Sequence, residues 1–386
     1  MNFYHFSFSK PIFLNFHKSA LRGATWGVAC IISSAVMIGH VALADDAIGT
    51  APRAARPPVA EVEGEFADFS QWKGVAEFID RMVQQHGFDR AALEKTFRQT
   101  RYVESAIRFI KPAPAGRPKN WRAYRARFVD PIRINAGVRF WNDNLDALTR
   151  AEAQYGVPAE IIVGIIGVET VFGRNTGNFR VMDAITTLAF DYPDTPTRAA
   201  RMAFFRGELE NTLLLARESN IDPFSLLGSY AGAIGLPQFM PGSIREFAVD
   251  FDGDGKVDLR GSAVDAIGSV ANYLSKHGWH AGSPIVFATR VGNGDSNAPR
   301  AWDQFIGQGL EAKFTLAELT SAGVMPNTRV PDDMLLGLVD LQNGAEATEY
   351  WLATTNFYAI TQYNRSYFYA MSVVDLGRAI RVARDR

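Results

Sequence analysis

From residue 68 onward, apolar residues recur at the spacing of amphipathic helices. The stretch "FSQWKGVAEFIDRMVQQHGF" carries such a stripe and ends at Gly87, which predicts a helix with a glycine C-cap. Asp89 is the predicted N-cap of the next helix, and a longer helix is predicted from about Pro131 to Tyr155. The stripe of the first helix comprises Trp72, Val75, Ala76, Ile79, Met82 and Val83.

A basic aromatic helix, "WRAYRARF", is predicted between these segments. Two interpretations of its arginines are open. The arginines either form a solvated helix face or contact an anionic polymer.

The next predicted helix is apolar almost all the way round. Pro158 suits its first turn, and the apolar run from Ile161 to Val168 ends at one carboxyl group, Glu169. A helix of this kind is normally central to a domain, and the small residues Gly164 and Gly167 let neighbouring helices approach closely.

The helical period weakens after residue 284. The runs "PIVFATRV" and "EYWLATTNFYAIT" predict short strands, the second a hairpin bent at Thr354-Thr355-Asn356. The sequence therefore predicts a mainly α (α+β) protein. We expect a helical lobe and a helical core over 67–284, a small mixed α/β lobe over 285–345, and C-terminal strands and a helix over 346–386 that return to the core.

The N-terminus is typical of an exported protein. Residues 1–44 contain no Asp or Glu, become apolar from Ala24 and end in Ala42-Leu43-Ala44, which predicts a signal peptide. The alternative is a retained anchor, because the apolar stretch is long enough to span a bilayer. Cys30, the single cysteine, lies in this segment, so the mature chain would form no disulfide. Residues 45–66 are rich in Ala, Pro and Arg and predict a linker.

Charge and motifs exclude several classes of function. The 386-residue chain has 40 Lys+Arg and 41 Asp+Glu, so its formal net charge of -1 gives no basic field for nucleic acid. The sequence contains no P-loop, no dinucleotide-binding glycine motif and no serine nucleophile elbow.

Glu169 is the candidate for acid chemistry. Burial at the end of an apolar helix, followed in importance by the negative end of the helix dipole, would raise the pKa of its carboxyl group. A carboxylic acid that stays protonated near neutral pH is what a general acid requires. The alternative is that Glu169 pairs with an arginine, Arg174 or Arg180, and only holds a loop.

An acidic loop, "DFDGDGKVDL", has the spacing of an EF-hand. Its position 12 is Gly261, where an EF-hand has a bidentate Glu, so a later residue must close the site. The loop predicts structural Ca²⁺ binding, and the alternative is a solvated acidic turn. The predicted ligands are Asp250, Asp252, Asp254, the Lys256 backbone carbonyl, Asp258 and, as the closing residue, Asp265.

Two motifs together carry a family resemblance. The segments "GIIGVETVFG" and "GSYAGAIGLPQFMPGSI" resemble the lytic transglycosylases of bacterial cell walls, of the membrane-bound lytic murein transglycosylase B type. The resemblance runs from about Asp68 to Leu376 and includes "VDFDGDGKVDLRGSAVDAIGSVANYLSKHGW" and "YAITQYNRSYFYAMSVVDLG". It implies a lysozyme-like helical core with an accessory helical lobe.

The resemblance also implies roles for individual residues. Glu169 matches the sole catalytic acid/base of the family. Two departures, Pro237 where the family often has Gly and Gly242 where it often has Ser, put local loop contacts in doubt. The residues that match its substrate-binding positions are Ser229, Gln238, Tyr273, Tyr363, Asn364 and Tyr369.

The implied activity is non-hydrolytic cleavage of the β-1,4 bond between N-acetylmuramic acid and N-acetylglucosamine, forming 1,6-anhydromuramoyl ends without a catalytic cofactor. The alternatives are a hydrolytic muramidase and a non-catalytic wall-binding scaffold. We expect a periplasmic monomer that binds peptidoglycan glycan strands and touches the membrane only if the N-terminal segment is retained. Cell-wall synthesis proteins are candidate partners.

Overall fold

The computed structural model of the protein describes residues 69–112, 118–292 and 300–386. These residues form 14 α-helices, six short strands and three 3-10 helices, which confirms the predicted mainly α (α+β) class. None of the helices in these ranges is long and apolar enough to cross a membrane. The predicted signal peptide or anchor (1–44, with Cys30) and the predicted linker (45–66) lie outside the described residues.

The elements follow one another along the chain with short connections. The first half contains η1 (Phe69–Gln71), α1 (Lys73–His86), α2 (Arg90–Gln99), α3 (Glu104–Ile110), α4 (Trp121–Arg125), α5 (Pro131–Asp143), α6 (Leu145–Tyr155), α7 (Ala159–Thr170), β1 (Phe179–Arg180) and α8 (Val181–Phe190). The second half contains α9 (Arg198–Glu218), η2 (Pro223–Ser225), β2 (Leu227–Gly228), α10 (Pro241–Phe247), α11 (Ala263–Lys276), β3 (Val286–Val291), η3 (Ala301–Phe305), α12 (Leu316–Ser321), β4 (Val324–Pro326), β5 (Gly337–Asn343), β6 (Glu346–Ala353), α13 (Thr355–Tyr363) and α14 (Tyr367–Arg384).

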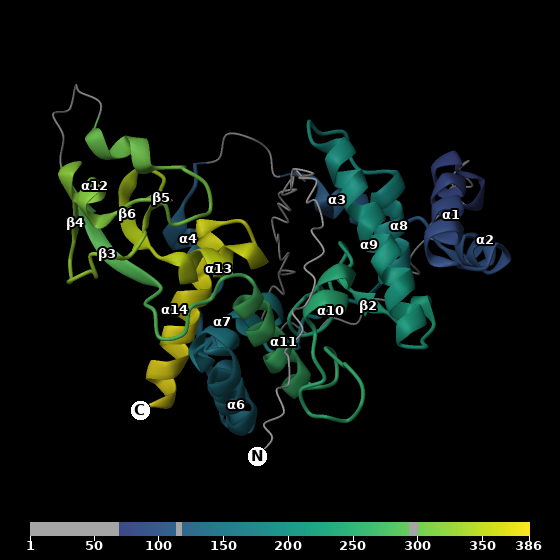
Figure 1. The fold of residues 1–386 in the computed structure, drawn as a ribbon, viewed down its shortest axis with the longest axis horizontal. Coiled ribbons are helices and arrows are strands. Elements are labelled where there is room, and N and C mark those ends of the chain that lie inside the picture. The colour runs from purple at the N-terminus through teal and green to yellow at the C-terminus, as the bar shows by residue number, and fades with distance from the viewer. Residues whose placement is uncertain (1–68, 113–117, 293–299) are drawn as a thin grey trace, which may run out of the picture.

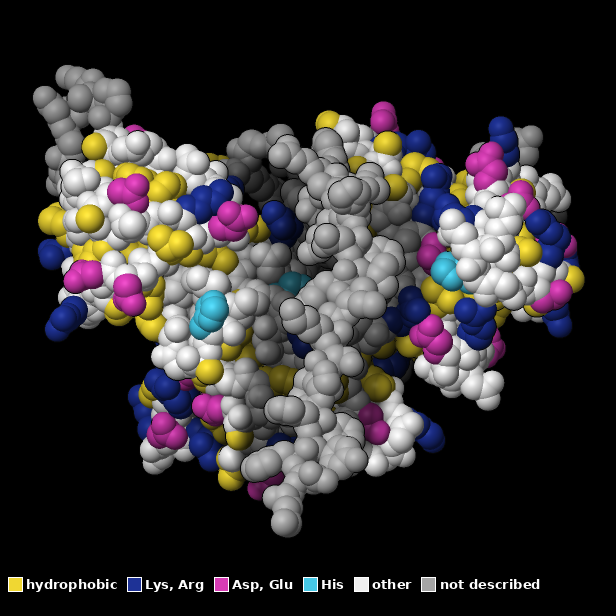
Figure 2. Space-filling view, viewed as in Figure 1, with side chains coloured by type: hydrophobic (Ala, Val, Ile, Leu, Met, Phe, Trp, Pro, Cys, Tyr) yellow, Lys and Arg dark blue, Asp and Glu magenta, His cyan; other side chains and the backbone are white. Residues whose placement is uncertain are grey.

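The helices and the larger sheet occupy different parts of the molecule. Figure 1 shows α1, α2, α8 and α9 on one side and the strands β3 to β6 with α12 on the other, while α7, α11 and α14 lie between them. Figure 2 shows basic and acidic side chains interspersed over the face in view, as expected for a net charge of -1.

Helix α7 is the centre of the main hydrophobic core. Every residue of α7 is buried except Glu160 and Glu169, and each buried isoleucine contributes roughly 1.5–3 kcal/mol to folding. A β-carbon added at Gly164 would lie 2.5 Å from the Val373 backbone oxygen of α14, so only glycine permits this close approach. The prediction of a central, apolar helix is therefore confirmed.

The sheet lobe has its own small core. Its four strands are antiparallel in the order β4-β3-β6-β5, and β5 and β6 form a hairpin around Gly344, whose φ is 65°. The residues of this second core are Trp302, Phe305, Leu319, Val324, Val330, Leu336, Leu338 and Leu352.

The predicted hairpin at Thr354-Thr355-Asn356 is wrong, because helix α13 begins there. The Thr354 side chain accepts a hydrogen bond from the Asn356 N–H at 3.2 Å and caps the helix. The aromatic and β-branched residues that indicated a strand, such as Phe357 and Ile360, are buried on α13. Residues 346–353, expected outside the mixed lobe, form β6 and pair with β3 and β5 of its sheet.

Two helix predictions also change. The long helix expected from Pro131 to Tyr155 is two helices, α5 and α6, separated at Asn144. The Asn144 side chain donates to the Phe140 carbonyl at 2.8 Å, so it satisfies a helix-terminal acceptor and favours a break. The "WRAYRARF" helix ends early, at Arg125.

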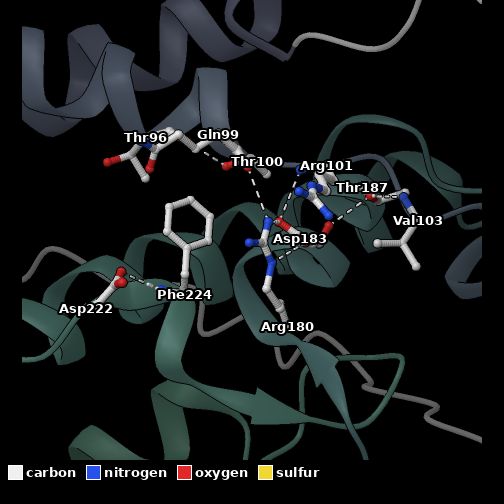
Figure 3. A network of polar contacts seen from close by, with 10 residues as sticks. All are labelled: Thr96, Gln99, Thr100, Arg101, Val103, Arg180, Asp183, Thr187, Asp222 and Phe224. Atoms are coloured by element: carbon white, nitrogen blue, oxygen red, sulfur yellow. Dashed lines mark hydrogen bonds and ion pairs between the residues drawn. The ribbon is translucent and has the colours of Figure 1, made fainter. Parts of the chain in front are cut away.

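A hydrogen-bond network around one ion pair joins the N-terminal helices to the start of α8 (Figure 3). The Arg180 guanidinium donates to both carboxylate oxygens of Asp183, at 2.6 and 2.8 Å, and also to the Gln99 carbonyl at 3.2 Å. Asp183 in turn accepts the Arg101 N–H at 3.1 Å. Arg180 lies in β1, which pairs with β2 immediately before Ser229, so this network also fixes the start of the glycine-rich loop (residues 229–240).

Candidate functional site

Glu169 lies in the last turn of α7 and is only partly exposed. The Tyr369 hydroxyl, from α14, donates a hydrogen bond to its Oε1 at 2.6 Å. Burial raises the pKa of Glu169 to about 7, while the hydrogen bond from Tyr369 acts in the opposite direction. A substantial fraction of this carboxyl group is therefore protonated at neutral pH and available as a proton donor.

Neither of the two arginines considered as partners of Glu169 forms an ion pair with it in the described part of the chain. Arg180 is engaged with Asp183, as Figure 3 shows. The side chain of Arg174 is exposed. The partner of the Glu169 carboxyl group in the described residues is therefore the Tyr369 hydroxyl.

Tyrosine rings gather beside Glu169. Tyr363 and Tyr369 stack with their centroids 6.4 Å apart, and Tyr273 packs edge-on against Tyr363 at 5.0 Å. Burial, and then the charge of Glu169, raise the pKa of Tyr363 and Tyr369 well above the usual value for tyrosine. These hydroxyls therefore remain protonated and act as hydrogen-bond donors.

Tyr124 belongs to the same group and was missed at the sequence level. Its pKa is raised to about 12, chiefly by burial and then by the charge of Glu169, so its hydroxyl lies within the electrostatic reach of the acid. Its ring packs against those of Phe128 and Phe368. The sequence signal was the segment "WRAYRARF", whose arginines drew the interpretation toward charge and away from its tyrosine.

The predicted substrate-binding residues differ in how they are held. Tyr363 donates its hydroxyl to the Pro237 carbonyl at 2.7 Å, and Tyr273 donates to the Gln362 carbonyl at 2.8 Å. Tyr273, Tyr369 and Asn364 are buried, whereas Tyr363 is partly exposed. Of these four residues, Tyr369 contacts Glu169 directly, and Tyr363 stacks on Tyr369 and supports the glycine-rich loop through Pro237.

Ser229 and Gln238 are partly exposed on the glycine-rich loop. Gln238 has a φ of 52°, a left-handed conformation that is uncommon outside glycine and often found at functional sites. Its side-chain amide donates to the Thr176 carbonyl at 3.1 Å and to the Gly235 carbonyl at 3.0 Å. Since both amide hydrogens are used within the protein, its carbonyl oxygen is the group that can meet a ligand.

The acidic loop brings three of its predicted metal ligands together. The carboxylates of Asp250, Asp252 and Asp254 lie within 4.8 Å of one another and are exposed. Asp250 accepts the N–H groups of Gly253 and Gly255 at 2.7 and 2.8 Å, which folds the loop around the three acids. An all-oxygen, carboxylate-rich donor set of this kind fits a hard cation such as Ca²⁺.

The other predicted metal ligands fix the shape of the loop. Asp265 is buried and accepts the N–H groups of Phe251 and Asp258, both at 2.8 Å, so it joins the beginning of the loop to its end. Asp258 accepts the Gly261 N–H at 2.8 Å, and Lys256 donates its N–H to Asp254 at 2.8 Å.

Comparison with known proteins gives consistent matches. Residues 69–378 match the Transglycosylase SLT domain family. The chain is 42% identical over 326 residues to the membrane-bound lytic murein transglycosylase B of Escherichia coli (strain K12), covering 82% of this chain and 85% of that protein.

Solved structures of lytic transglycosylases also resemble this protein. The soluble lytic transglycosylase SltB1 of Pseudomonas aeruginosa superposes with a TM-score of 0.73 at 46% identity, covering 81% of this chain and 100% of that one. The Escherichia coli lytic transglycosylase Slt35 in complex with calcium superposes with a TM-score of 0.72 at 41% identity, covering 83% of this chain and 96% of that one. These matches confirm the predicted lysozyme-like fold.

Replacing Glu169 by Gln should stabilise the protein in a pH-dependent way. Because folding raises the pKa of Glu169 from 4.5 to about 7, its ionisation destabilises the folded state increasingly as pH rises through this range. Relative to the wild type, Glu169→Gln should gain up to about 3 kcal/mol of unfolding free energy between pH 4 and pH 8. Urea unfolding at the two pH values measures this difference. Exposed Glu246→Gln is the control, and an equal effect of Glu169→Gln at both pH values would contradict the assignment.

Proposed function

The chain belongs to the Transglycosylase SLT domain family and is a lytic transglycosylase acting on peptidoglycan, and we propose that Glu169 is the sole acid/base of its reaction. The observation that carries this proposal is a partly buried carboxyl group whose pKa is raised to about 7 and whose hydrogen-bond donor is a tyrosine. The other acidic residue of α7, Glu160, lies at the opposite end of the helix and pairs with Arg381 at 2.8 Å.

The proposed reaction uses the carboxyl group twice. Glu169 first donates its proton to the oxygen of the β-1,4 bond between N-acetylmuramic acid and N-acetylglucosamine, and the bond from the muramoyl C1 to this oxygen breaks. The muramoyl C6 hydroxyl then attacks C1, and its proton passes to the Glu169 carboxylate. The acid is restored, no water is consumed, and the product carries a 1,6-anhydromuramoyl end.

A single carboxyl group suffices for this reaction. Hydrolytic glycosidases ordinarily use two carboxyl groups, one to protonate the leaving group and another to act as base or nucleophile. Here the nucleophile belongs to the substrate, so its attack is intramolecular and has little translational entropy to lose. We propose that Ser229 and the carbonyl oxygen of Gln238 contact the glycan. In this proposal Tyr273, Tyr363, Asn364 and Tyr369 shape the wall behind the acid.

Calcium has a structural place in this proposal. Asp250, Asp252 and Asp254 would bind Ca²⁺ through their carboxylates, with Asp258, Asp265 and the Lys256 carbonyl completing or bracing the loop. The Leu236 N–H donates to the Leu259 carbonyl at 2.7 Å, so the end of the acidic loop supports the glycine-rich loop directly. The crystallised relative Slt35 is a calcium complex, which supports this assignment.

The proposed location is the periplasm. The pattern of residues 1–44 supports export, with the segment either cleaved or kept as an anchor. The Escherichia coli relative is named as membrane-bound, in keeping with a site of action at the cell wall. We propose that the enzyme acts as a monomer on glycan strands, with cell-wall synthesis proteins as candidate partners.

Mass analysis of products tests the reaction. Purified sacculi digested with the mature protein should release muropeptides lighter by one water than those released by a hydrolytic muramidase. Glu169→Gln should release none while still binding sacculi, because only the proton donor is lost. Hydrated products would favour the muramidase alternative, and binding without any product from the wild type would favour the scaffold alternative.

Replacing Tyr369 by Phe should move the pH dependence of kcat/KM. The Tyr369 hydrogen bond lowers the pKa of Glu169, so its removal should shift the alkaline limb, expected near pH 7 in the wild type, to higher pH. Tyr367→Phe, in the same helix but bonded to the Gly309 carbonyl, should leave the limb in place. A downward shift in Tyr369→Phe, or no shift, would contradict the role of this bond.

Calcium should stabilise the wild type and much less a loop variant. At a Ca²⁺ concentration about 100 times Kd, binding should add about 2.7 kcal/mol to the unfolding free energy, and a chelator should reverse the gain. Asp252→Asn removes one of the three clustered carboxylates, whereas Asp332→Asn changes an exposed residue outside the loop. Thermal unfolding with and without CaCl₂ provides the measurement, and an equal calcium effect in wild type and Asp252→Asn would rule out this site.

A further inference from the structure

Thr170, the residue after the acid, makes hydrogen bonds that a buried helical threonine does not ordinarily make. A buried threonine usually donates to the carbonyl four residues earlier in its own helix. Thr187 and Thr212 do so, at 2.8 and 2.7 Å. Thr170 is also completely buried, but its shorter bond, at 2.8 Å, goes to the Leu236 carbonyl, while the Ile166 carbonyl of its own helix lies at 3.3 Å.

The same hydroxyl also holds the turn that follows the acid. Its oxygen accepts the Gly173 N–H at 3.0 Å. Between these residues Val171 and Phe172 both have a left-handed backbone, with φ of 51° and 57°. A β-branched residue disfavours this conformation by roughly 1–2 kcal/mol, so the surrounding contacts must hold it in place. The Thr170 hydroxyl is one of these contacts.

Leu236 belongs to the most constrained part of the glycine-rich loop. Its N–H is held by the Leu259 carbonyl at 2.7 Å, and the next residue, Pro237, accepts the Tyr363 hydroxyl at 2.7 Å. Gln238 follows with its own left-handed backbone. Thus one hydroxyl joins the residue after Glu169 to a loop position two residues before Gln238.

We propose that Thr170 is a positioning residue whose hydroxyl sets the distance between the proton of Glu169 and the sugar held by the glycine-rich loop. This inference rests on the proposed function of Glu169 and Gln238. Without the hydroxyl, the acid and the loop would each keep their own contacts and still bind glycan. Their relative placement would relax, and proton transfer depends steeply on such placement.

The test compares two substitutions at Thr170. Thr170→Val keeps the shape and removes the hydroxyl, whereas Thr170→Ser keeps the hydroxyl and removes the methyl group. Steady-state kinetics on soluble glycan strands, at a temperature where each variant is folded, should show kcat lowered by about 10- to 100-fold in Thr170→Val. KM should change by less than about threefold, and Thr170→Ser should remain close to the wild type.

Thr187→Val is the matched control. Thr187 is a completely buried threonine that likewise donates to one carbonyl and accepts one N–H group, from Val103 at 3.0 Å, but it lies in α8. Its loss should lower the melting temperature without lowering kcat. If Thr170→Val proves too unstable to assay, Thr170→Ala, which also lacks the hydroxyl, is measured against Thr170→Ser in its place.

The outcomes separate this inference from the proposed function. A folded Thr170→Val with wild-type kcat would overturn the positioning role, as would a Thr170→Ser variant as impaired as Thr170→Val, since packing would then be responsible. Both results would leave the acid assignment intact provided that the wild type forms anhydro products and Glu169→Gln forms none. If Glu169→Gln retains turnover, the proposed function fails first and independently.

Discussion

Removal of one carboxyl group from water is the constraint on which the rest of the site depends. Burial of a charge is costly, and it raises the pKa of Glu169 to about 7, so a substantial fraction of the carboxyl group carries its proton at neutral pH. The apolar helix α7 buries the carboxyl group, and α14 covers α7 and supplies Tyr369, whose hydroxyl donates to this group. The burial that raises the pKa of Glu169 therefore also lowers the stability of the folded protein once this group is ionised.

Hydrogen bonds around Glu169 limit how far the carboxyl group and the glycine-rich loop can move. Tyr369 orients the carboxyl group, Tyr363 and Thr170 hold adjacent carbonyls of the glycine-rich loop, and Leu259 ties this loop to the acidic loop. Thr170 and Tyr369 are buried, whereas Glu169, Ser229, Gln238 and Tyr363 are partly exposed, so the hydrogen bonds hold the site from its buried side. Stiffness of this kind keeps donors and acceptors in place before the substrate arrives.

The features that could be predicted from the sequence are those that depend on residues close together along the chain. The burial and raised pKa of Glu169 could be predicted because the apolar run before it is contiguous, and the clustering of the aspartates because their spacing is that of a known loop. Contacts between distant residues could not be predicted from spacing, such as the bond from Tyr369 to Glu169 across 200 positions. Helix α13 could not be predicted because its residues favour strands in isolation, whereas burial and the Thr354 cap decide its conformation. The Asn144 break escaped notice because helical periodicity continues through it.

Helix α14 bears on the acidity of Glu169 although its tyrosine lies 200 positions away along the chain. Without Tyr367–Arg384, α7 would lack the helix that packs on Gly164, and the Glu169 carboxyl group would lose the Tyr369 hydroxyl and gain contact with water. Hydration of the carboxylate lowers the pKa of a glutamate toward its ordinary value. The raised pKa of Glu169 is therefore a property of two helices packed together, and neither helix would produce it alone.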